Sequence, residues 1–134
     1  MKLFLPDTNA ISVLLRGTDR ELRARFDAEI LSLRLSALVI AEREFGIVQH
    51  EAGLRYRERF ELLVSNVPVV PFTREDAHHY ARIRADLERI GQGIGPIDTL
   101  IAAQALRLGA TVVTHNLREF SRVPGLKCED WQAT

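Results

Sequence analysis

The feature that most constrains this chain is a regular alternation between short apolar segments and longer amphipathic ones. The short segments have the length of strands, and the longer ones carry apolar residues at the 3.6-residue spacing of helices. We predict strands at residues 3–6, 31–36, 67–70, 110–114 and 126–128, and helices at residues 8–16, 37–49, 55–65 and after Thr18, Thr73 and Pro96. Such an alternation predicts an α/β protein whose parallel sheet is covered on both faces.

Residues at the ends of these segments predict local details. Thr18 and Glu21 have the spacing of a capping box, in which the threonine side chain bonds forward and the glutamate bonds back. Gly17 closes the helix before it, and Gly91 suits the end of the helix that starts at Thr73. Pro68 cannot donate to a neighbouring strand, so we expect its strand at an edge of the sheet.

The apolar spacing also predicts which face of each helix is buried. The expected stripes are Leu38, Ala41, Phe45 and Val48; Tyr56, Phe60 and Leu63; Ala77, Tyr80, Ile83, Leu87 and Ile90; and Ile97, Ile101, Ala105 and Leu108. Val39, Ile40 and Ile47 lie off the first stripe, so we expect them to offer an apolar surface to a partner or to a second subunit.

Composition narrows the class of protein. The 134 residues fit one domain, with 18 basic residues against 18 acidic ones, so no overall basic field indicates nucleic acid. Sixteen of the basic residues are arginine, which suits phosphate recognition but is also a good helix former. Cys128 is the only cysteine, and no apolar run reaches the length of a signal peptide or a membrane span. We therefore expect a cytoplasmic protein without a membrane partner.

Acidic residues follow the ends of predicted strands or open predicted helices. Asp7 follows the first strand, Glu42 and Asp98 lie in helices beside the small residues Gly46 and Ala102, and Asn116 follows the strand at 110–114. In open α/β sheets, ligands bind outside the carboxyl ends of the strands. The sequence therefore predicts that these side chains meet at one rim of the sheet.

Each acid also has a structural explanation. Asp7 can cap the helix that begins at Thr8, Asp98 can complement the dipole of the helix that begins at Pro96, and Glu42 can be a half-exposed glutamate. Only the convergence of all three at one place favours a site, and this prediction requires that they lie close enough to share one ion.

Converging carboxylates repel one another, by about 4 kcal/mol for two unit charges about 4 Å apart at an effective dielectric near 20. A divalent cation relieves this repulsion. Hard oxygen ligands favour Mg²⁺ or Mn²⁺ over zinc. Such an ion lowers the pKa of a bound water and neutralises phosphate charge. We therefore predict a Mg²⁺ (or Mn²⁺) site.

Four motifs in order carry a resemblance that spans nearly the whole chain. They are Pro6-Asp7-Thr8-Asn9, Ala41-Glu42-x-x-Phe45-Gly46, Gly95-Pro96-Ile97-Asp98-x-x-Ile101-Ala102 and Val113-Thr114-His115-Asn116-x-Arg118-Glu119-Phe120. Together they resemble the PIN-domain ribonucleases, and most of all the VapC toxins of bacterial toxin–antitoxin pairs. The resemblance implies a three-layer α/β/α sandwich and a metal-dependent endoribonuclease that acts on RNA, often tRNA. It further implies a cognate antitoxin that blocks the site and a toxin homodimer.

The resemblance also implies roles for individual residues. Asp7, Glu42 and Asp98 match the family's acidic core: Asp7 and Asp98 would ligate the metal, and Glu42 would ligate it or assist deprotonation of water. The chain departs from the family at Asn116, where many relatives carry aspartate, and some rely on the acid three residues later, here Glu119. Asn116 and Glu119 are therefore both candidates for the fourth position, and cleavage would leave a 5′-phosphate and a 3′-hydroxyl.

Arg16, Arg43 and Arg118 are candidates for RNA contacts, with a solvated surface as the alternative. Two rival functions remain at this stage. A degenerate PIN scaffold would bind RNA or a partner without cutting, which Asn116 makes thinkable. A metal-dependent phosphohydrolase would need a second acid two residues after its nucleophilic aspartate, where this chain has Asn9.

Overall fold

A computed structural model describes residues 1–133 of the chain. Its elements are β1 (Phe4–Pro6), α1 (Thr8–Arg16), α2 (Arg20–Ala28), the 3₁₀ helix η1 (Ile30–Ser32), β2 (Leu35–Ser36), α3 (Ala37–Gln49), α4 (Leu54–Asn66), β3 (Val69–Val70), α5 (Arg74–Arg89), α6 (Pro96–Leu108), β4 (Thr111–Val113), α7 (Leu117–Phe120) and β5 (Lys127–Glu129). Strands and helices alternate as predicted.

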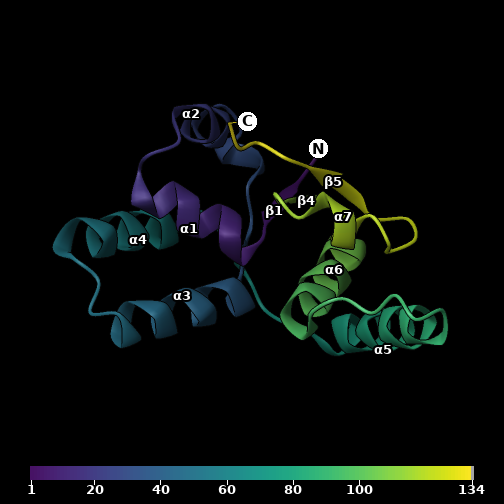
Figure 1. Cartoon of the computed structure of the whole chain (residues 1–134). Coiled ribbons are helices and arrows are strands. Elements are labelled where there is room, and N and C mark those ends of the chain that lie inside the picture. The colour runs from purple at the N-terminus through teal and green to yellow at the C-terminus, as the bar shows by residue number, and fades with distance from the viewer. Residues whose placement is uncertain (134) are drawn as a thin grey trace.

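All strand pairs are parallel. β4 lies between β1 and β5, and β2 pairs with β3. A single bridge connects Phe4 to Leu33, and the amide of Arg34 donates to the carbonyl of Phe4 at 2.9 Å. These contacts join the two sets of strands into one order, β3-β2-β1-β4-β5. The strands lie between α1 to α4 on one side and α5 and α6 on the other (Figure 1). This arrangement confirms the α/β/α sandwich, and β3 lies at the edge that Pro68 predicted.

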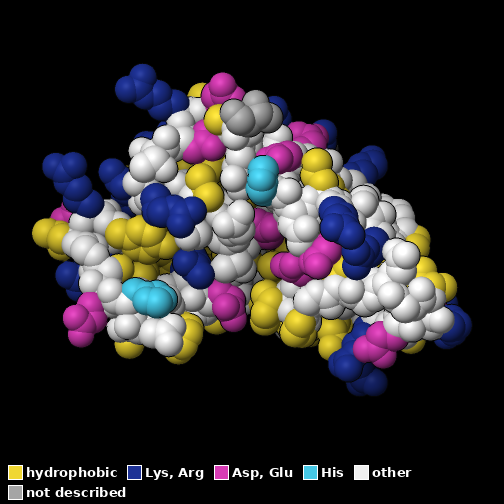
Figure 2. Space-filling model, viewed as in Figure 1, with side chains coloured by type: hydrophobic (Ala, Val, Ile, Leu, Met, Phe, Trp, Pro, Cys, Tyr) yellow, Lys and Arg dark blue, Asp and Glu magenta, His cyan; other side chains and the backbone are white. Residues whose placement is uncertain are grey.

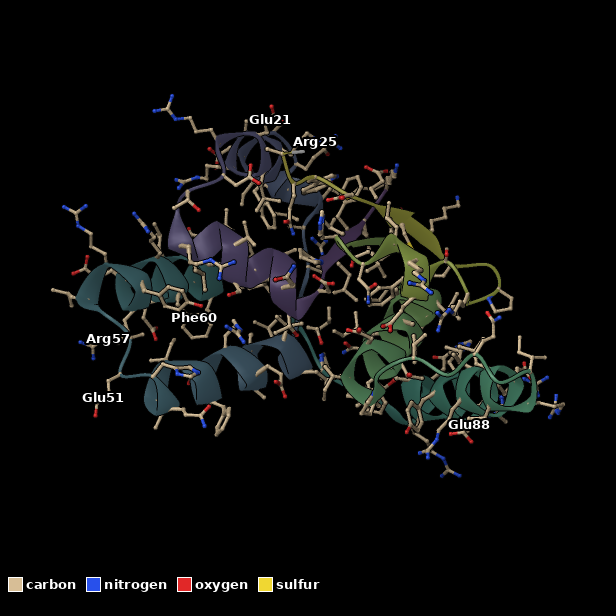
Figure 3. All side chains as sticks on the ribbon, viewed as in Figure 1. Glu21, Arg25, Glu51, Arg57, Phe60 and Glu88 are labelled. Atoms are coloured by element: carbon tan, nitrogen blue, oxygen red, sulfur yellow. The ribbon has the colours of Figure 1, made fainter. Side chains whose placement is uncertain are left out.

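The core forms where the central strands meet the inner faces of the helices. Leu5, Val112, Ile101 and Phe120 are fully buried there. Phe60, labelled in Figure 3, lies on the inner side of α4 as predicted. None of the helices formed by residues 1–133 is both long and apolar enough to cross a membrane.

The last described residues pack against β1 and α2, near the N-terminus. Trp131 packs edge-on against Phe4 and Phe26, with ring centroids 4.9 and 5.3 Å apart. The guanidinium of Arg25 lies 4.7 Å from the Trp131 ring centroid, and the amide of Ala133 donates to Asp19. The C-terminal segment therefore crosses from β5 to α2 and covers the start of β1 (Figure 1).

Two local predictions near the N-terminus were wrong. The N-cap of α2 is Asp19, whose side chain accepts from the amide of Leu22 at 2.9 Å, so Thr18 forms no capping box. Aspartate caps a helix as well as threonine does, and the helix begins one residue later. The strand predicted at residues 31–36 begins later: residues 31 and 32 belong to the 3₁₀ helix η1, which leaves Leu31 exposed, Leu33 forms a single bridge, and only Leu35–Ser36 form a strand.

The predicted stripe of α3 was also wrong. Phe45 and Val48 are 61% and 78% exposed, whereas Val39 is fully buried and Ile40 and Ile47 pack against the core. The surface that we expected to face a partner is thus the inner face. α3 is apolar nearly all round at its start, so helical spacing alone does not choose its buried side.

The apolar stripes predicted on α5 and α6 are confirmed in part. On α5, Ile83 and Leu87 are buried as predicted, but Ala77 is exposed and Ile90 is 66% exposed at the end of the helix. On α6, Ile101 and Ala105 are buried as predicted.

Candidate active site

The register of β1 and β4 sets Asp7 beside Thr114. Pro6 is paired with Val113, and the amide of Asp7 donates to the carbonyl of Val113 at 2.9 Å. The hydroxyl of Thr114 then donates to Asp7 Oδ2 at 2.6 Å, and the amide of Ala10 donates to Asp7 Oδ1 at 2.8 Å. Asp7 therefore caps α1, as the structural explanation held, and is also fixed at the carboxyl end of the central strand pair.

The turn after β4 brings Asn116 and Glu119 to the same place. The amide of Asn116 donates to the Thr114 hydroxyl at 2.8 Å, which orients the turn. The Asn116 side chain donates from Nδ2 to Glu119 Oε2, also at 2.8 Å. Thr114 thus connects Asp7 to the pair formed by Asn116 and Glu119.

Asp98 approaches from the first turn of α6. Pro96 starts that helix, and a Cβ atom built on Gly95 would lie 3.9 Å from Asp98 Oδ2. The pKa of Asp98 is raised from 3.8 to about 6. Burial is the largest cause of this rise, and the charges of Asp7 and Glu119 add to it. A hydrogen bond from Asn116 opposes the rise. The structure thus couples three of the predicted acids electrostatically.

The pKa of Asp7 is also raised, mainly because only 4% of the residue is exposed. The hydrogen bonds from Thr114 and Ala10 hold this rise back, the charge of Asp130 adds to it, and His115 opposes it. His115 in turn lies 2.9 Å from Asp130, measured from Nδ1 to Oδ2. Ionised Asp7 is therefore short of positive partners.

Glu42 lies in a different environment. It is half-buried on α3 and lines a depression with Arg16, Arg43 and Tyr56. Its charge is not among those that act on Asp7 or Asp98. Its membership of the metal site stays a prediction.

The donor set suits a hard divalent cation. Asp7, Asp98 and Glu119 offer carboxylate oxygens, and Asn116 keeps its carbonyl oxygen while its amino group donates. The hydroxyl oxygen of Thr8, next to Asp7, is buried without a hydrogen-bond partner. Within residues 1–133, however, no three His, Cys, Asp or Glu side chains form a ready-made metal cluster. The site is therefore an open, negatively charged rim.

Acidic side chains gather near the middle of the face shown in Figure 2, where α1, α3, α6 and α7 converge, and basic side chains surround them. Thr114 was not predicted as a site residue, although it lies within the last of the four motifs. The signal was its position directly after a strand paired with β1, where a hydroxyl can hold Asp7. A rim of this kind can bind a cation, and through it a phosphate.

Residues 4–126 match the PIN domain family model. The chain belongs to the PIN domain family.

Within that family its relatives include VapC proteins. It is 34% identical to the tRNA(fMet)-specific endonuclease VapC of Salmonella typhimurium, over 98% of this chain and 99% of that protein. It is 30% identical to ribonuclease VapC2 of Haemophilus influenzae, with the same coverage. The crystal structure of DNA-bound VapBC from Salmonella typhimurium superposes with a TM-score of 0.87 at 34% identity, covering 98% of this chain and 99% of that one.

Proposed function

We propose that this protein is a metal-dependent endoribonuclease of the toxin–antitoxin type, with tRNA as its substrate class. The observation that carries the proposal is the coupling of Asp98 to Asp7 and Glu119 beside Asn116 at the ends of β1 and β4. Full-length similarity to proteins named as a tRNA endonuclease and ribonucleases supports the choice of RNA.

Asp7, Asp98 and Asn116 would hold Mg²⁺ or Mn²⁺. When bound, the ion supplies Lewis-acid stabilisation of phosphate charge. The residues themselves perform the remaining tasks. Thr114 holds the Asp7 carboxylate in place, and Asn116 orients the Glu119 carboxylate. Glu119 and Glu42 are the candidates that would take a proton from the attacking water.

Inhibition by a partner is part of the proposal. The solved relative is a VapBC assembly, and we propose that this chain likewise has a cognate antitoxin that covers its site. As part of the same proposal, the protein would act in the cytoplasm on cellular RNA.

The test uses the purified chain and a tRNA pool, with Mg²⁺, with Mn²⁺ and with chelator. We expect cutting only with added metal, and none with Asp98→Asn. Sequencing of the cut ends would identify the RNA and the bond, and a 5′-phosphate should be found. A folded protein that binds RNA but cuts none with either metal would instead be the non-catalytic scaffold.

A further inference from the structure

A cleft next to the proposed active site contains arginines whose charge is not balanced. It lies between α1, α3 and α4 and has a volume of about 440 Å³. That volume is within the range of small-molecule sites, about 300–1,000 Å³. The residues that matter for its chemistry are Ser12, Arg16, Glu42, Arg43, Phe45 and Tyr56. The cleft is therefore large enough for a segment of a polar ligand.

Arg43 is the central cation of this cleft, and its hydrogen bonds are incomplete. Its Nη1 atom donates to Ser12 Oγ and to Tyr56 OH, both at 3.4 Å, which is longer than the usual 2.7–3.2 Å. Its Nε atom is buried without any partner. A half-buried guanidinium with such weak contacts has donors left for an anion.

No carboxylate compensates this charge. The ion pairs found within residues 1–133 engage other arginines, such as Arg84 with Glu88 and Arg107 with Asp76, but neither Arg43 nor Arg16. Glu42 lines the same cleft and is its one acidic neighbour. A cation bound by Glu42 would remove the repulsion between that carboxylate and an incoming phosphate.

The surroundings of Arg43 leave it accessible. Gly46 lies one turn later on α3, and a Cβ atom built there would be 3.5 Å from Arg43 Nη1. The absence of a side chain at Gly46 thus keeps one side of the guanidinium uncovered. Phe45, 61% exposed, lies at the rim, where a ring can stack on an unpaired base.

The cleft is near enough to the acidic rim for one RNA strand to reach both. α1 begins directly after Asp7, and Ser12 lies five residues further, about 7.5 Å along the helix axis. A separation of this order is within the reach of one short single strand.

From these observations we infer that the cleft binds a phosphate of the RNA strand that reaches the acidic rim, with Arg43 as its main ligand. This inference rests on the proposed function, since it assigns a substrate contact to that site. Arg16 adds long-range attraction, and the Ser12 and Tyr56 hydroxyls supply further donors. Arg43 is a positioning residue, because it holds the substrate and does not touch the reacting atoms.

The experiment measures binding of a fluorescent, unstructured RNA oligonucleotide to the full chain in chelator, where no cutting occurs. Arg43→Gln should weaken binding about tenfold, since a charged hydrogen-bonded contact is lost. Between about 50 and 200 mM salt, the slope of log affinity against log salt should fall by about 0.7, the value for one single-strand phosphate contact. Arg43→Lys should keep the slope and recover part of the affinity.

Arg57→Gln is the matched control. Arg57 follows Tyr56 on α4 but lies at the outer edge of the molecule (Figure 3), and its substitution should change affinity less than twofold. If folded Arg43→Gln matches this control in affinity and salt slope, the inference is wrong.

Gly46→Leu tests the same site if Arg43→Gln does not fold. It covers the guanidinium while keeping the charge and improving helix propensity. Weaker RNA binding by this variant supports the inference, and unchanged binding overturns it. If the wild-type protein cuts RNA but Arg43→Gln binds RNA as tightly as the wild type does, the inference alone is refuted. Arg43-dependent binding without metal-dependent cutting refutes the proposed function alone.

Discussion

Replacing Asp98 by asparagine removes one charge from the acidic rim while keeping the size of the side chain. Burial, together with the charges of Asp7 and Glu119, raises the pKa of Asp98 from 3.8 to about 6. At about 1.4 kcal/mol per pKa unit, the ionised form destabilises the fold by about 3 kcal/mol. Because the side chain is only partly buried, solvent screening reduces this to about 1–2 kcal/mol. Without divalent cations, Asp98→Asn should gain that free energy of unfolding at neutral pH.

The gain should depend on pH in a defined direction. The folded state binds the Asp98 proton more tightly than the unfolded state does, because the folded pKa is the higher one. The wild-type protein therefore becomes less stable as the pH rises from 3.8 through about 6. The stability difference between variant and wild type should be absent below about pH 3, where Asp98 is neutral in both states, and complete above about pH 7.

Urea unfolding followed by circular dichroism, in chelator and over this pH range, measures the difference. For a domain of this size, 1 kcal/mol shifts the melting temperature by about 3–5 °C, so thermal scans give a second reading. Asp86→Asn serves as control, because Asp86 is an exposed residue on α5 that pairs with Arg89. Its effect should be small and nearly independent of pH.

Adding Mg²⁺ should stabilise the wild-type protein and have much less effect on Asp98→Asn, because the proposed metal site exists only in the native rim. The reasoning is refuted if Asp98→Asn is less stable than wild type at neutral pH. Asp98 would then be a structural residue of the first turn of α6, as its alternative explanation holds.

Three further predictions concern other contacts. Thr114→Val should lower the free energy of unfolding by about 1–3 kcal/mol and raise the pKa of Asp7 further, because the hydrogen bond from the Thr114 hydroxyl to Asp7 Oδ2 is lost. Urea unfolding would measure the first effect, and the pH profile of RNA cutting would measure the second. Asp76→Asn should cost about 2 kcal/mol or more, because the buried Asp76 pairs with Arg107. The pKa of Asp76 is lowered in the folded protein, so this stabilisation is fully present above the ordinary pKa of 3.8. It is lost as the pH falls through the lower pKa of the folded state, and acid titration of both proteins would detect the loss. Ultracentrifugation should show a dimer that Val48→Ser weakens, and a strict monomer at high concentration would contradict the expected homodimer.

Local sequence signals predicted much of this molecule. The bounds of α1 and α3, the proline that starts α6 and the glycine that ends α1 all agree with the structure. These features depend on residues next to one another, so they can be found without knowing the fold. The electrostatic coupling of Asp98 to Asp7 agrees with one further rule, that ligand sites of open α/β sheets lie outside the carboxyl ends of the strands.

Features that depend on distant parts of the chain were not predictable in this way. The role of Thr114 depends on its alignment with β1, and the burial of Arg43 depends on how α3 rotates toward α1 and α4. The spacing of Thr73 and Asp76 announces a capping box, but nothing local announces the ion pair between Asp76 and Arg107. Glu42 was predicted from its position beside Gly46 and from the resemblance, and its place in the arginine cleft follows from the same rotation of α3.

The packing of Trp131 on Phe4 has a consequence for biosynthesis. Asp7 follows β1 and is synthesised before the residues that complete its surroundings, Asp98, Thr114 and Asn116. The aromatic contact that covers β1 joins residues far apart in the sequence, so it can form only after Trp131 has been synthesised. A nascent chain therefore lacks the assembled acidic rim, and premature termination would release an inert product.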